Sequence, residues 1–172
     1  MKRAIPFLVC LLLVSCEEWR TVEIEETAET VVEQGTVVEQ LVGSMGFGDF
    51  LNMDISANQE LQNSDIQKNH IEKAKLTLLR LTITDPPSGQ DFTFLDSLEF
   101  FVESPNASKQ RIAHLDAFEA GETTVDLELD DVELAPYATD DYMNVTAEVT
   151  GRRPDNDTTI EALMRIEVVA KL

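Results

Sequence analysis

The sequence predicts an all-β protein whose folded part is an antiparallel β-sandwich, most simply immunoglobulin-like, with about seven or eight strands. Three observations predict this fold. Apolar and polar residues alternate with a period of two in most segments after residue 46. Clusters of Gly, Pro, Asn and Asp separate these segments. No stretch shows the 3.6-residue apolar period of a long amphipathic helix.

The first residues have the pattern of a signal peptide. Lys2 and Arg3 precede an apolar run over residues 4–14, and the small residue Ser15 stands before Cys16. This run is about half the length of the roughly 20 residues that a membrane-spanning helix needs. We therefore expect residues 1–15 to be removed.

The residues Leu13-Val14-Ser15-Cys16 resemble the lipobox of bacterial lipoproteins. The resemblance implies that Cys16 becomes the first residue, carries a diacylglyceryl group and attaches the protein to a membrane. In the sorting rule of such lipoproteins, Asp after the cysteine favours the inner membrane. Glu17 and Glu18 stand there instead, which implies the outer membrane and leaves the leaflet open.

Residues 16–45 are predicted to be an acidic, flexible tether. Residues 17–40 contain eight glutamates, and the pentapeptide at residues 30–34 recurs at 36–40. Slippage within a spacer explains the repeat, and an added edge strand is the alternative. The glycines at 43, 46 and 48 are predicted to form a hinge, so that the sandwich covers residues 46–172.

Several strands follow from the alternation. After a first strand near residues 50–55, apolar residues alternate from Ala74, and their parity changes at Leu78-Leu79, which predicts a β-bulge. The turn residues 85–89 end this strand. The clearest strand, residues 160–172, has one continuous apolar row. The other strands are expected at residues 92–102, 111–115, 125–129 and 143–149.

Composition excludes several classes of function. Loss of Lys2 and Arg3 with the leader changes the net charge from −20 to −22, and such a charge repels nucleic acid and favours basic proteins or divalent cations as partners. Cys10 is removed and Cys16 is lipidated, so no disulfide is expected. His70 and His114 stand in unrelated contexts, and no Gly-x-Ser-x-Gly motif occurs. The sequence therefore predicts a protein without catalytic residues.

Two sets of residues are candidate binding sites. Acidic turns place Asp131, Asp141, Asp155 and Asp157 where converging loops of a sandwich bind calcium, although turns also select Asp for its own backbone hydrogen bonds. Phe101 follows Phe100 and so must point to the opposite face of its strand. Exposed beside Phe92 or Tyr142, it would mark a partner site. Burial under a loop is the alternative.

The resulting hypothesis is a lipid-anchored, non-enzymatic binding or assembly module of the cell envelope with an unidentified envelope protein as its partner. A calcium-dependent carbohydrate-binding or adhesive domain is the second hypothesis. An envelope enzyme, which would need a deep pocket with convergent titratable groups, is the third.

Overall fold

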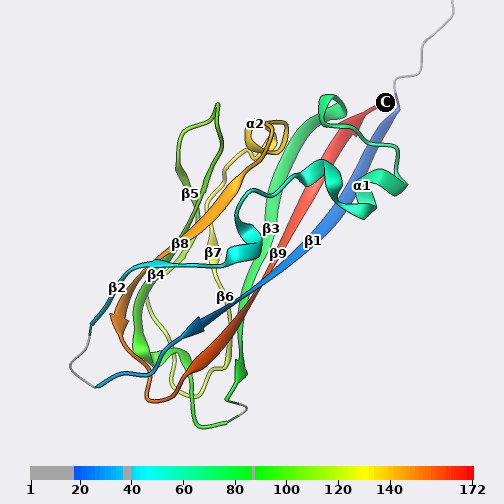
Figure 1. Cartoon of the computed structure of the whole chain (residues 1–172). Helices are drawn as coiled ribbons and strands as arrows, with labels where there is room; N and C mark the ends of the chain where they lie inside the picture. The colour runs from blue at the N-terminus through cyan, green and yellow to red at the C-terminus, as the bar shows by residue number, and fades with distance from the viewer. Residues whose placement is uncertain (1–17, 37–39, 87) are drawn as a thin grey trace, which may run out of the picture.

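The computed structural model describes residues 18–36, 40–86 and 88–172, so that the predicted signal peptide and Cys16 lie outside the described residues. The described residues contain nine strands in two antiparallel sheets, which face each other as a sandwich (Figure 1). The first sheet has the order β1 (Trp19–Val32), β9 (Thr158–Lys171), β3 (Ile71–Asp85) and β6 (Thr124–Asp126). The second has the order β2 (Gln40–Met45), β8 (Asn144–Arg152), β4 (Leu95–Glu103), β5 (Gln110–Leu115) and β7 (Glu128–Leu129).

The all-β class and the two-sheet sandwich confirm the sequence-based prediction, but the strand order is not that of an immunoglobulin domain. The first strand pairs with the last, and β2 pairs with β8. In an immunoglobulin sheet the first two strands are neighbours. With β7 as an addition at one edge, the order β1-β9-β3-β6 over β2-β8-β4-β5 is that of a jelly roll. Apolar alternation reveals which face of a strand is buried and does not reveal its partners.

The acidic segment after Cys16 is a strand of the sandwich and not a tether. All 14 residues of β1 are in register with β9, from Trp19 opposite Lys171 to Val32 opposite Thr158. Ile24 and Ala28 face the core, while Glu23 and Glu25 face solvent. The sandwich therefore begins at Trp19 and not at residue 46. The added edge strand, which the sequence left open, is correct, and the predicted hinge overlaps β2.

The long strand β3 contains the predicted irregularity. Its register with β9 shifts between Leu76 and Leu78, so that Thr77 has no direct partner in the ladder. After the shift Leu79, Leu81 and Ile83 are buried, whereas Leu78 is only half-buried. One extra residue changes which side of the strand faces the core. The parity change in the sequence is therefore a true bulge.

The core lies between the sheets. From the first sheet it takes the apolar row of β9, which is buried from Ile160 to Ala170, as predicted, while Leu172 is exposed. The second sheet contributes Phe100 and the residues of β4 that point to the same side as Phe100. The ring of Phe47 packs 5.6 Å from that of Phe100, between ring centroids, and extends the core beyond the strands. Burial of these side chains is the main stabilising contribution.

Short helical turns cover the connections. They are η1 (Gly48–Phe50), η2 (Ile55–Ala57), α1 (Gln59–Asn63), η3 (Lys68–His70), η4 (Phe92–Phe94) and α2 (Ala135–Ala138). The turns η1 and α1 lie against β1, and Arg20 donates a hydrogen bond of 3.0 Å to the carbonyl oxygen of Ser64 after α1. Within the described part of the chain, no helix is both long and apolar enough to span a bilayer.

Candidate functional site

The outer face of the second sheet carries a group of interlocked polar side chains around Phe101, which we call the outer belt. Strand β4 turns Leu98, Phe100 and Val102 inward and leaves Glu99 and Phe101 outside. In β5, a bulge lets Ile112 and Ala113 both point inward, because Phe100 pairs with Ala113 and Phe101 pairs with Arg111. The belt consists of Glu99, Phe101, Lys109, Arg111, His114, Glu128, Asp130 and Glu148.

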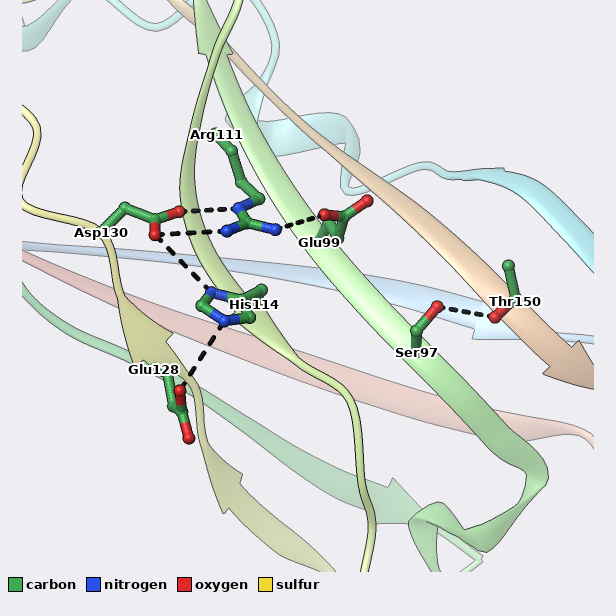
Figure 2. A network of polar contacts seen from close by, with 7 residues as sticks. All are labelled: Ser97, Glu99, Arg111, His114, Glu128, Asp130 and Thr150. Atoms are coloured by element: carbon green, nitrogen blue, oxygen red, sulfur yellow. Dashed lines mark hydrogen bonds and ion pairs between the residues drawn. The ribbon is translucent and has the colours of Figure 1, made fainter.

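Arg111 lies between two carboxylates (Figure 2). Its Nη1 is 2.7 Å from Oε1 of Glu99 on β4, and its Nε is 2.9 Å from Oδ2 of Asp130, just after β7. The hydrogen bonds with Asp130 and Glu99 raise the pKa of the guanidinium above its usual value. This side chain therefore connects β4 and β5 with the residue that follows β7 across the outer surface.

His114 lies beside the same carboxylates. Its Nε2 is 3.7 Å from Oε2 of Glu128 and its Nδ1 is 3.8 Å from Oδ1 of Asp130 (Figure 2). The Nδ1 atom is buried and has no hydrogen-bond partner among the described residues. The hydroxyl of Ser97 on the same face pairs with that of Thr150 at 2.6 Å. The partner of the Ser97 hydroxyl in this structure is therefore Thr150 and not His114.

Phe101 points outward, as the sequence predicted, and its ring is half-buried. The Nζ atom of Lys109 lies 4.4 Å from the ring centroid and also 2.5 Å from Oε1 of Glu148. Phe92 is fully buried and packs against Phe94 and Phe118 in the core. The expected apolar patch with Phe92 is therefore not formed. Phe101 is instead a half-buried aromatic side chain in a cation–π contact with Lys109.

The four aspartates predicted to bind calcium are not brought together. Asp141 precedes β8 and Asp155 follows it, so these turns lie at opposite ends of a strand roughly 25 Å long. Asp131 binds Lys75 at 2.7 Å. Asp155 lies 3.8 Å from Arg152, and Asp157 accepts a hydrogen bond of 2.8 Å from the Gln34 amide. The described residues contain no group of three metal-ligating side chains. These aspartates act as turn and ion-pair residues.

Asp140, next to Asp141, shows what such an aspartate does in this fold. Its carboxylate accepts hydrogen bonds of 2.8 Å from the amide and the side chain of Asn106, and one of 2.9 Å from the Asp141 amide. Partial burial works against ionisation, but these hydrogen bonds outweigh it and lower the pKa of Asp140 to about 2. The carboxylate thus joins the β4–β5 loop to the turn before β8.

Replacement of Asp140 by Asn should therefore change the acid side of the stability profile. Because the folded-state pKa is below the unfolded one, the stabilisation is present above about pH 4 and is lost as the pH falls through about 2. We expect the wild-type protein to exceed the variant in urea midpoint near neutral pH, and the difference to shrink below about pH 3. Asn106→Ala, which removes a donor, should lower the midpoint at neutral pH in the same way. A difference independent of pH would contradict this role.

A surface cleft lies at one edge of the first sheet. It is lined by Arg80, Glu119, Glu122 and Asp126 among others, has a volume of about 480 Å³ and is widely open to solvent. Arg80 is paired with Asp126 at 2.5 Å, and Glu119 and Glu122 leave the lining with a net negative charge.

The sequence did not predict the network around Arg111 and His114. In a regular strand, residues 111 and 114 point to opposite faces, because they are three positions apart. The bulge at Ile112 places both on the outer face. Two successive apolar residues, Ile112 and Ala113, were the only local sign of that bulge.

Fold and surface together define a jelly-roll β-sandwich with a polar outer belt. No protein-family model matches the chain, and no curated protein matches it. Among solved structures, the chain is similar to a decameric BFDV capsid protein, with 9% identity over 90% of this chain and 98% of that chain and a TM-score of 0.41. A 60-mer of BFDV capsid protein has 11% identity over 92% and 95% of the two chains and a TM-score of 0.36. At these TM-scores the likeness supports no conclusion about function.

Proposed function

We propose that this chain is a lipid-anchored lipoprotein of the cell envelope that acts as a non-enzymatic binding or assembly module. The observation that carries the proposal is the position of the lipobox-like sequence, whose Cys16 precedes the first strand, at Trp19, by three residues. A sandwich with this leader is held at a membrane by its acyl chains. The glutamates after Cys16 favour the outer membrane.

The outer belt supports a role in binding a partner protein. Phe101 presents an aromatic edge between Lys109 and Arg111, and aromatic and arginine side chains are enriched where interfaces are tightest. Lys109 and Arg111 are already paired with carboxylates of the belt, so the charged side chains beside Phe101 are in place before a partner binds. The calcium-dependent alternative needs converging loops, and the loops with Asp141 and Asp155 lie at opposite ends of β8.

The anchor is tested with Cys16→Ser in the full chain. The wild-type protein should partition into the membrane fraction and the detergent phase, while the variant should be found in the aqueous phase, because the thioether cannot form. In the variant the leader stays uncleaved, and this leader is itself a short apolar run. The readout should therefore include the mass of the N-terminus of each protein. Equal partitioning of both proteins, with no lipid mass on Cys16, would contradict the proposal.

The binding face is tested by mild crosslinking in the native envelope with Phe101→Ser. Leu163→Ser is the matched control, because Leu163 is a half-buried apolar residue on the outer face of the other sheet. We expect a defined crosslinked protein to be recovered with the wild type and the control and to be lost with Phe101→Ser. Retention with all three proteins would place binding elsewhere.

A further inference from the structure

The chain has a single tryptophan, and it lies at the start of the first strand. Trp19 is 55% exposed and is paired in register with Lys171, whose Nζ atom is 5.9 Å from the indole centroid. Leu172, also exposed, donates its amide hydrogen to the carbonyl oxygen of Glu18 at 2.9 Å. This end of the first sheet, where β1 begins and β9 ends (Figure 1), therefore presents a large aromatic ring, a leucine and a lysine side by side.

The short length of chain between Cys16 and Trp19 limits how far the start of β1 can lie from a membrane that holds Cys16. Cys16 and Trp19 are three positions apart in the chain, which is a distance of at most roughly 11 Å. A strand of 14 residues such as β1 is about 45 Å long. If Cys16 carries acyl chains, the start of β1 is held beside the headgroups, and the other end of the strand is much farther from Cys16. The 30-residue tether expected from the sequence would have imposed no such limit.

The two ends of the neighbouring strands β1, β9 and β3 differ in charge. Near Trp19, the basic residues Arg20, Lys73 and Lys171 accompany the acidic residues Glu18 and Glu72, which leaves this end close to neutral. At the opposite end, Glu29 stands directly across from Glu161. Glu33 and Asp157 lie in the adjoining turns, where Arg153 pairs with Glu33 at 3.7 Å and the acidic residues remain in excess. An anionic membrane surface attracts basic groups and repels acidic ones, so of these two ends the Trp19 end meets the weaker repulsion.

We infer that the sandwich stands end-on on the membrane, with Trp19 inserted at the lipid–water interface and Lys171 beside it. The inference rests on the proposed lipid anchor and adds the orientation of the domain. Tryptophan is enriched at this interface because its ring is amphipathic. The acyl chains supply the affinity and Trp19 sets the orientation. In this orientation the outer belt on the second sheet faces sideways, away from the lipid.

The single tryptophan makes the test direct. The full, lipidated chain is reconstituted into vesicles of phosphatidylethanolamine and phosphatidylglycerol whose acyl chains carry bromine, which quenches a tryptophan only when it lies close to the chains. The matched control is the double variant Trp19→Phe, Val31→Trp. Val31 lies on the same strand and outer face as Trp19, is 60% exposed, and is twelve residues, about 40 Å, farther along.

We expect the fluorescence of Trp19 to be strongly quenched and shifted to shorter wavelength in these vesicles, and that of the tryptophan at position 31 to remain unchanged. Quenching of both positions would mean that the sandwich lies flat, and quenching of neither would mean that it stands clear of the bilayer. Either result overturns the orientation while the protein still floats with the vesicles. If the wild-type protein does not float, the lipid anchor itself is wrong, and the orientation with it.

Discussion

Ile24→Ala is expected to destabilise the protein by about 2–5 kcal/mol, the usual loss for truncation of a fully buried isoleucine. Ile24 is 0% exposed and lies opposite Ile166 in the middle of the pairing between β1 and β9. The cost combines the lost burial of the side chain with the cavity left between the two sheets. Urea unfolding, followed by the change in the midpoint at constant m-value, measures it.

Thr21→Ala is the matched control for Ile24→Ala. Thr21 is on the same strand, three residues earlier, and faces solvent opposite Val169. Its replacement should shift the midpoint little, as is usual at exposed sites. If Ile24→Ala were as mild as Thr21→Ala, residues 19–32 would contribute nothing to the folded core. The segment would then behave as the tether that its glutamates suggested.

Gly151→Ala is expected to destabilise the fold by about 3 kcal/mol or more, through overpacking against backbone that is not free to move. Gly151 lies near the end of β8, where β4 begins, with a backbone φ of +155°. An added Cβ would lie 2.3 Å from the carbonyl oxygen of Phe94 and 2.8 Å from Cα of Leu95. Both contacts are with backbone atoms, so the variant must separate the two central strands of the second sheet.

Gly43→Ala separates this contact from the effect of the backbone conformation. Gly43 is also in a strand, has a φ of +133° and has no neighbour within 4 Å of an added Cβ. We expect a cost of roughly 1 kcal/mol for the unfavourable conformation alone. Thermal unfolding of the two variants gives the difference. Equal losses would show that the approach of β8 to β4 is not tight.

The two ends of the chain differ in how well their sequence predicted their structure. In β9, charged residues alternate with large apolar ones, so the buried row from Ile160 to Ala170 was evident. In β1, Ile24 and Ala28 are the inward-facing apolar residues, and glutamates stand between them. Glu26 and Thr30 also stand at positions on the inward side of the strand. A strand at the edge of a sheet buries only part of its inner face. Its apolar signal was therefore too weak to outweigh the acidic composition.

The bulges in β3 and β5 also differ in how well the sequence predicted them. The bulge in β3 was predictable because large apolar residues stand on both sides of it, and Leu79, Leu81 and Ile83 show the new parity. The bulge in β5 occurs in a strand of six residues, too short to show two parities. It nevertheless decides that Arg111 and His114 share one face. The outer belt was therefore not predictable.

Local properties of the chain could be predicted from its residues: the lipobox-like pattern at residues 13–16, the period of most strands and the turns between them. These depend on the chemistry of neighbouring residues and on which side of a strand is apolar. The tertiary structure alone decided that β1 pairs with β9 and that the sheets follow the jelly-roll order. It also decided that Asp141 and Asp155 lie at opposite ends of a strand. Pairing between segments more than a hundred residues apart is selected by the fit of whole faces in the core, which no local pattern specifies.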